Sequence, residues 1–173
     1  ETGAPLRGST AQGYADDSCW ARGQAWAIYG FTLNYRYTAD ETLLDAARRC
    51  ADYFLDHLPA DHVAYWDMVF GDGSGEERDS SAAAIAVCGL DELVRYLPEG
   101  ARRQRYQAAA RDMLASLIAD YTPRDQPAWN TLLLHGVYDK PKAIGVDEGC
   151  LWGDYFYLEA LMRMLEPDWR IYW

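Results

Sequence analysis

The stretch Asp79–Pro98 reads DSSAAAIAVCGLDELVRYLP, and its composition decides the fold class of this chain. It opens with Asp79 and Ser80, residue types that commonly cap the first turn of a helix, and continues to Leu97 mostly with small or apolar residues. A helix that is apolar on every side is buried by other elements, whereas a helix with one apolar face covers others. We therefore expect a buried helix over about 79–97.

Four further helices are predicted, and they fall into two kinds. The segments of about 17–37 and 150–165 are strongly apolar like 79–97, whereas 40–57 and 101–121 carry an apolar stripe on one face only. Alternation of buried and covering helices is typical of a two-layer helical toroid, an α/α barrel. The predicted fold class is therefore all-α, with one short strand expected at Leu132–Leu134.

Each of the three buried helices follows an acidic residue that could cap it: Asp17, Asp79 and Asp147. Because the buried helices of a toroid run parallel, the long segments that precede them open at the same end. Aromatic residues in or beside these segments are expected near that rim: Tyr14, Trp20, Tyr65, Trp66 and Trp129. Flat rings stack on sugar faces, so the rim suggests saccharide binding; core packing of the same rings is the alternative.

Composition bounds the class of protein before any motif is considered. The 173 residues are half hydrophobic and 14% aromatic, which indicates one folded domain and excludes disorder. Sixteen basic against 27 acidic residues leave a net charge of −11, so neither nucleic acid nor an anionic membrane surface is an expected partner. No apolar run could span a bilayer and no signal peptide is visible at the start. We expect a cytoplasmic, bacterial protein.

The cysteines and histidines carry no metal or disulfide pattern. Four cysteines are widely spaced without a C-x-x-C, which favours free thiols in a reducing compartment. The three histidines lack zinc-ligand spacing. The sequence thus predicts no metal and no cofactor.

The stretch Gln12–Gly30, QGYADDSCWARGQAWAIYG, is the richest in chemically active residues. Arg22 and Trp26 are four positions apart and share one face of the expected helix. The positive end of a helix disfavours an arginine in its first turns, so Arg22 needs an anionic partner. The candidates are Asp16 or Asp17, an aspartate of another buried helix, and a bound carboxylate or sulfate.

The pattern Gln-Gly-Tyr-x-Asp-Asp-Ser-x-Trp-x-Arg-Gly-Gln-x-Trp-x-x-Tyr-Gly resembles the signature of the unsaturated glucuronyl hydrolases, glycoside hydrolase family 88. Three further stretches match that family in order: Tyr65–Asp67, Asp79–Ala84 and Trp152–Leu161. The resemblance covers nearly the whole chain. It implies an (α/α)₆ barrel, of which residues 1–173 would form about half, the C-terminal half, with no second domain.

The activity that the resemblance implies is removal of a 4,5-unsaturated uronic acid from the non-reducing end of an oligosaccharide. An aspartic acid protonates the enol-ether double bond, water adds to the other carbon, and the hemiketal opens without metal or cofactor. Carried over by position, Gln12, Trp20, Arg22 and Trp26 match substrate-binding residues. Arg22 and the tryptophans would hold the sugar, and Gln12 would lie near the uronate.

Two departures from the family limit this implication. Ala11 stands where a histidine is common, and family members are about twice as long, with both catalytic aspartates in the half that precedes this segment. No residue here matches either aspartate, so the chain alone is expected to be inactive. The carboxylates that could be mistaken for them are expected to act as helix caps and arginine partners: Asp16, Asp17, Asp67 and Asp147.

The expected small-molecule partner is an unsaturated uronic-acid oligosaccharide, and the expected protein partner is an N-terminal half chain or a second copy. Two alternatives stay open at this point. One is a non-catalytic helical module that binds carbohydrate and oligomerises. The other is a related hydrolase of unsaturated galacturonyl–rhamnose substrates.

Overall fold

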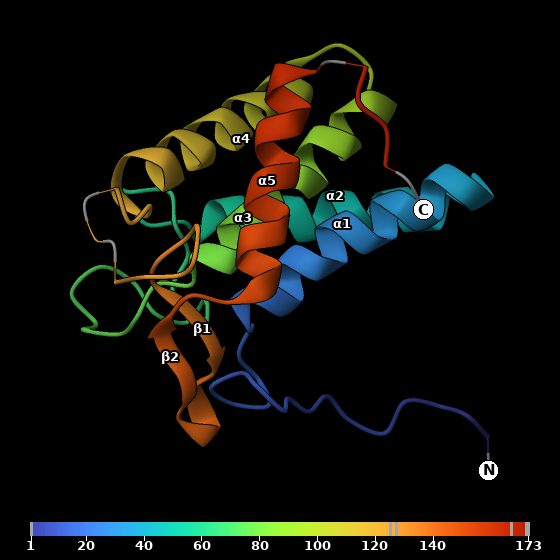
Figure 1. The fold of residues 1–173 in the computed structure, drawn as a ribbon. Coiled ribbons are helices and arrows are strands. Elements are labelled where there is room, and N and C mark those ends of the chain that lie inside the picture. Colours follow the sequence, from blue (N-terminus) through green and yellow to red (C-terminus); the bar gives the residue numbers. More distant parts are fainter. Residues whose placement is uncertain (1, 125, 127, 167, 172–173) are drawn as a thin grey trace.

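The computed structural model describes residues 2–124, 126, 128–166 and 168–171. Within these residues the chain forms five α-helices and one two-stranded sheet (Figure 1). The helices are α1 (Ala21–Thr38), α2 (Glu41–Asp56), α3 (Ser80–Leu93), α4 (Ala101–Asp120) and α5 (Leu151–Leu165), and the strands are β1 (Gly136–Asp139) and β2 (Ile144–Glu148).

Helix α3 lies at the centre of the molecule, as its composition predicts. Every residue of α3 except Asp91 is buried. It packs between α1 and α5, while α2 covers α1 and α4 covers α3 (Figure 1). The helix ends at Leu93 and continues as a 3₁₀ turn over Val94–Tyr96, which together nearly fill the predicted range.

The predicted alternation of inner and covering helices is confirmed in this arrangement. α1, α3 and α5 form the inner row, and α2 and α4 each bury one face against it. The row is open at α5, where three leucines of the described chain are more than half exposed: Leu151, Leu158 and Leu165. Such a face is normally covered by another apolar surface.

Only one of the three predicted caps of the inner helices is correct. The side chain of Asp79 accepts from the backbone N–H of Ser81 at the start of α3. α1 begins later than expected, at Ala21, because the carbonyl of Trp66 accepts from the N–H of Ala21 and replaces a cap at Asp17. Asp147 was also wrong as a cap, because it lies in β2 and α5 begins after it.

The expected strand at Leu132–Leu134 is wrong, and the strands lie further along the chain. Leu132 and Leu133 lie in bends, and Leu133 and Leu134 are buried. The apolar character of this run therefore reflects burial and not an extended strand. The strands β1 and β2 pair antiparallel, with Val137 opposite Val146. A short 3₁₀ turn and left-handed backbone at Ala143 reverse the chain between them.

The four cysteines are free, as predicted, and Cys88 is fully buried while the others are partly buried. No helix in the described part of the chain has both the length and the apolar character that crossing a bilayer requires.

Candidate functional site

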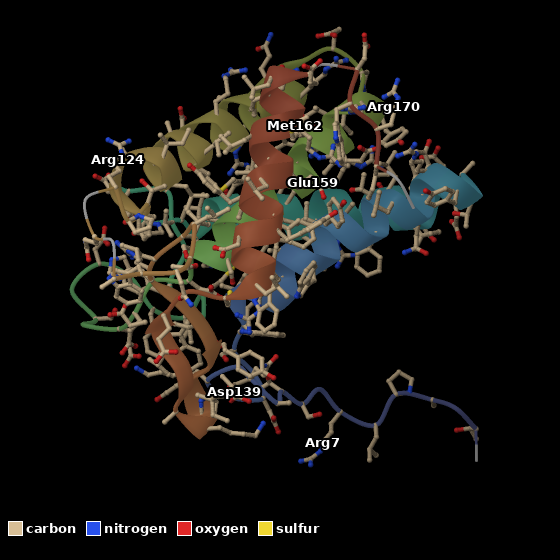
Figure 2. The ribbon with its side chains drawn as sticks, in the orientation of Figure 1. Arg7, Arg124, Asp139, Glu159, Met162 and Arg170 are labelled. Carbon is tan, nitrogen blue, oxygen red and sulfur yellow. The ribbon has the colours of Figure 1, made fainter. Side chains whose placement is uncertain are left out.

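Three segments that are far apart in sequence meet where the inner helices begin. The side-chain Nε2 of Gln12 donates to the carbonyl of Tyr138, 2.9 Å away, and thereby ties the N-terminal segment to β1. The N–H of Tyr14 donates to Asp67 Oδ2 at 2.9 Å, which ties the same segment to the loop before α3. The prediction that the long segments gather at one end is confirmed, and Figure 2 labels Asp139 in the hairpin at this end.

Arg22 is the most buried of the predicted site residues, with 2% of its surface exposed. Its Nη1 lies 3.1 Å from Asp79 Oδ2, and the guanidinium also donates to the carbonyls of Val137 and Tyr138. Among the partners that the sequence left open, the structure thus selects an aspartate of another buried helix.

Asp16 and Asp17 are wrong as partners of Arg22. Both are exposed, and Asp16 Oδ1 instead accepts from the N–H of Thr10 at 3.0 Å. A solvated carboxylate gains little from an ion pair, whereas an arginine directed into the interior requires a buried anion and fixed carbonyl acceptors. The direction of the Arg22 side chain therefore decides its partner.

Asp79 joins the same three elements from the other side of the ion pair. It is fully buried, and its Oδ1 accepts from the backbone N–H of Ser81 and of Val137, at 3.1 and 3.3 Å. Burial raises the pKa of the Asp79 carboxyl, while the positive charge of Arg22 and these hydrogen bonds act in the opposite direction. The pair fixes α1, α3 and β1 relative to one another.

Two tryptophan rings face the Arg22 guanidinium. Its Cζ lies 4.8 Å from the ring centroid of Trp20 and 5.3 Å from that of Trp152. The ring of Tyr138 continues this aromatic surface, with its centroid 5.1 Å from Trp152. The indole Nε1 of Trp152 is buried without a hydrogen-bond partner in the described part of the chain. The cluster thus offers ring faces and an uncommitted donor.

One cluster therefore contains three of the four predicted site residues, Gln12, Trp20 and Arg22. The fourth, Trp26, lies one turn further along α1. Its ring packs edge-on against Phe156 at 5.1 Å and remains partly exposed. Gln12 and Arg22 share an acceptor, the carbonyl of Tyr138. No pattern in the sequence pairs residues 12 and 22 with residue 138, because only the tertiary structure brings these three segments together.

Sequence reasoning gave no role to Trp152 or Tyr138, although Trp152 lies in one of the four matched stretches.

Two expected rim aromatics turn out to be buried, namely Tyr65 and Trp66, whereas Tyr14 and Trp129 are exposed. The ring of Tyr65 lies under the guanidinium of Arg78, at 3.7 Å. Core packing, the alternative interpretation, is therefore correct for Tyr65 and Trp66.

Asp67 and Asp147 are neither helix caps nor arginine partners. Asp67 is fully buried and braces the loop, because its Oδ2 accepts from Tyr14 N and from Ser18 Oγ, at 2.9 and 2.7 Å. Asp147 pairs instead with Nδ1 of His135 at 2.6 Å. The described residues contain no group of three or more His, Cys, Asp or Glu side chains placed to hold a metal ion.

Aromatic ring faces beside amide groups are the kind of surface to which saccharides bind. No family model matches the chain. The "Unsaturated chondroitin disaccharide hydrolase" of Streptococcus pneumoniae is 53% identical over 174 residues, all of this chain and 44% of the relative. The "Unsaturated glucuronyl hydrolase" of Bacillus sp. strain GL1 is 44% identical, again over all of this chain and 46% of the relative.

A solved structure agrees with these relatives. A mutant unsaturated glucuronyl hydrolase from Streptococcus agalactiae, complexed with dGlcA-GalNAc6S, aligns with a TM-score of 0.90 and 51% identity, over 99% of this chain and 46% of that one. The chain is thus similar over its whole length to the unsaturated glucuronyl hydrolases, and it spans less than half the length of these relatives.

Proposed function

We propose that the chain forms part of the substrate-binding wall of an enzyme that hydrates unsaturated uronyl saccharides, and that its five helices are half of an (α/α)₆ barrel. The observation that carries the proposal is the cluster of Gln12, Trp20 and Arg22 with Trp152, built from the stretch that resembles the family signature. The inner row that is open at α5 supports the half-barrel, because a toroid needs further helices there.

The residues of the cluster have different tasks in this proposal. The ring of Trp20 contacts a pyranose face, since flat apolar rings match the C–H surface of a sugar. Arg22 is buried and bonded to four protein acceptors, so it acts as a positioning residue that holds Trp20, Trp152 and β1 together. The Oε1 of Gln12 would accept from a sugar hydroxyl beside the uronate, because the carboxylate itself has no proton to donate.

The substrate class follows from the relatives, whose names specify unsaturated chondroitin disaccharide and dGlcA-GalNAc6S. For this chain we assign an unsaturated uronate linked to an amino sugar. The family reaction requires an aspartic acid that protonates the enol-ether. The aspartates described above instead accept hydrogen bonds within loops or pair with charged side chains. The chain by itself should therefore bind this disaccharide without turning it over.

The experiment uses the purified 173-residue chain and an unsaturated chondroitin disaccharide. Tryptophan fluorescence should show saturable binding, while the ultraviolet absorbance of the enol-ether stays constant. Trp20→Ala should weaken binding by about tenfold, the typical effect of one aromatic anchor. Tyr37→Ala is the matched control, because this exposed ring lies in the last turn of α1, at the other end of that helix from Trp20.

The outcomes separate the parts of the proposal. Loss of absorbance with this chain alone would overturn the assignment of catalysis to other residues. Binding that is unchanged in Trp20→Ala would overturn the substrate wall. Mixing in a separately produced chain that supplies the remaining part of a relative-length protein should restore turnover.

A second candidate function is a helical module that binds carbohydrate without catalysis and assembles with itself. The exposed leucines of α5 favour it, because they give a second copy an apolar surface. The alternative galacturonyl–rhamnose substrate and the cytoplasmic, bacterial location stay predictions from the sequence.

A further inference from the structure

A charged cavity lies at the end of the molecule opposite the hairpin. It has a volume of about 540 Å³ and lies between the ends of α3 and α5 and the start of α4. Its charged lining residues are Arg95, Arg103, Arg163, Arg170 and Asp91. Figure 2 labels Arg170 at this end and Asp139 at the other. Since α3 runs from one site toward the other, its 14 residues separate them by about 20 Å.

The lining of this cavity is rich in arginine, although the net charge of the whole chain is negative. Four guanidinium groups and one carboxylate line it, in a protein whose net charge is −11. Asp91 is shared between two of the arginines, at 3.4 Å from Arg95 and 3.1 Å from Arg163. Arg170 makes no ion pair with any described residue. The other three lining arginines also pair with glutamates outside the lining, so Arg170 carries the positive charge that no described carboxylate pairs with.

Arg163 is the buried part of the site. Its side chain has no exposed area, and it donates from Nε to Glu159 at 2.9 Å and from Nη1 to Glu92 at 3.0 Å. Its Nη2 has no hydrogen-bond partner among the described residues. A buried guanidinium nitrogen without an acceptor costs free energy, and such a group commonly indicates a bound ion or water.

The electrostatic surroundings of Arg103 agree with this. Its Nη1 pairs with Glu99, a side chain that is 81% exposed and so offers a weak, solvated partner. Its Nε is buried and has no hydrogen-bond partner in the described part of the chain. Arg103 of α4 and Arg163 of α5 therefore each carry an uncommitted donor beside one cavity.

We propose that this cavity binds a small tetrahedral oxyanion of the phosphate or sulfate class. Arginine suits this ligand, because its planar fork matches the spacing of two oxygens on phosphorus or sulfur. Arg103, Arg163 and Arg170 supply the donors, and Asp91 holds Arg95 and Arg163 in place. A free ion and an ester group on a sugar present the same oxygens, so both fit this chemistry. The site is independent of the saccharide cluster at the other end.

The test is a titration of the 173-residue chain with sodium phosphate, sodium sulfate and N-acetylgalactosamine 6-sulfate, each at an ionic strength held constant with sodium chloride. Calorimetry should show saturable, one-site binding. The double variant Arg103→Gln/Arg170→Gln should weaken it by at least about tenfold, which corresponds to about 1.4 kcal/mol. Arg102→Gln is the matched control, since this neighbour on α4 pairs with Asp52 and does not line the cavity.

A second measurement needs no variant. In the unsubstituted chain, the side-chain Nε–H signals of Arg103 and Arg163 should shift on adding phosphate, whereas that of Arg102 should not. The proposal is overturned if no probe binds beyond sodium chloride, if these signals do not move, or if Arg102→Gln weakens binding as much as the double variant. Binding of the inorganic ions alone assigns the site to a free ion, and binding of the sugar sulfate as well extends it to an ester group.

Discussion

At the scale of single residues, the Arg22–Asp79 pair holds the candidate site together. Both side chains are buried, and both also bond to β1: Arg22 to the Val137 carbonyl and Asp79 to the Val137 N–H. Removing one partner leaves the other charge buried and unpaired, whereas removing both removes this penalty. The pair is therefore expected to show a large coupling energy.

We predict that Arg22→Met lowers the free energy of unfolding by about 3–5 kcal/mol. The double variant Arg22→Met/Asp79→Asn should be less destabilised than the sum of the two single changes, because no charge is left unpaired. Urea unfolding of the four proteins measures this cycle. Arg48→Met, which removes the exposed pair with Asp45, is the control and should cost less than about 1 kcal/mol. Additive effects of the two single changes would contradict the prediction.

At the scale of secondary-structure elements, the close approach of α1 and α3 depends on a glycine. A Cβ atom added at Gly89 would lie 3.0 Å from Ile28 Cγ2 and 3.0 Å from the backbone N of Tyr29. Helices that approach this closely leave no room for a methyl group, and backbone atoms cannot move aside as a flexible side chain can. Gly89 thus sets the spacing within the inner row.

We predict opposite effects for two glycine-to-alanine changes in these helices. Gly89→Ala should lower the free energy of unfolding by about 1–3 kcal/mol, because the methyl group overpacks against α1. Gly30→Ala should raise it by about 0.5–1 kcal/mol, since no atom lies within 4 Å of the added Cβ and alanine favours the helix. Urea midpoints of the two variants measure the difference. A Gly89→Ala protein as stable as Gly30→Ala would show that the helices separate without cost.

At the scale of the whole molecule, the inner row presents an uncovered apolar face. Leu151, Leu158 and Leu165 of α5 are 80%, 52% and 72% exposed, and they lie on the side away from α3. Apolar surface of this kind associates in water. The charge of −11 opposes association between copies, and salt screens that repulsion.

We predict that the 173-residue chain associates with itself in a concentration-dependent manner, more strongly at high salt. Light scattering should give a mass above 19.6 kDa that falls to the monomer value in Leu158→Glu/Leu165→Glu. Leu132→Glu is the matched control, because this exposed leucine lies outside α5 and should leave the mass unchanged. A monomer at all concentrations and salt levels would contradict the prediction.

The sequence by itself determined which helices are buried and which cover them. Runs that are apolar on every side must be enclosed wherever they occur, so α3 and the alternation of layers follow from local composition. The family resemblance was equally local, because it rests on ordered motifs that need no tertiary information. The cap that was correct, Asp79, depends only on a residue two positions away.

Only the tertiary structure decided the partners of the buried polar groups. Arg22 selects Asp79 over the nearer Asp16 and Asp17, and Gln12 reaches the Tyr138 carbonyl 126 positions along the chain. The start of α1 was missed because a backbone acceptor from a distant loop, the carbonyl of Trp66, replaces a local cap. Hydrogen bonds and ion pairs are directional and are strengthened by burial, so which of several chemically equal partners is used depends on where packing places them.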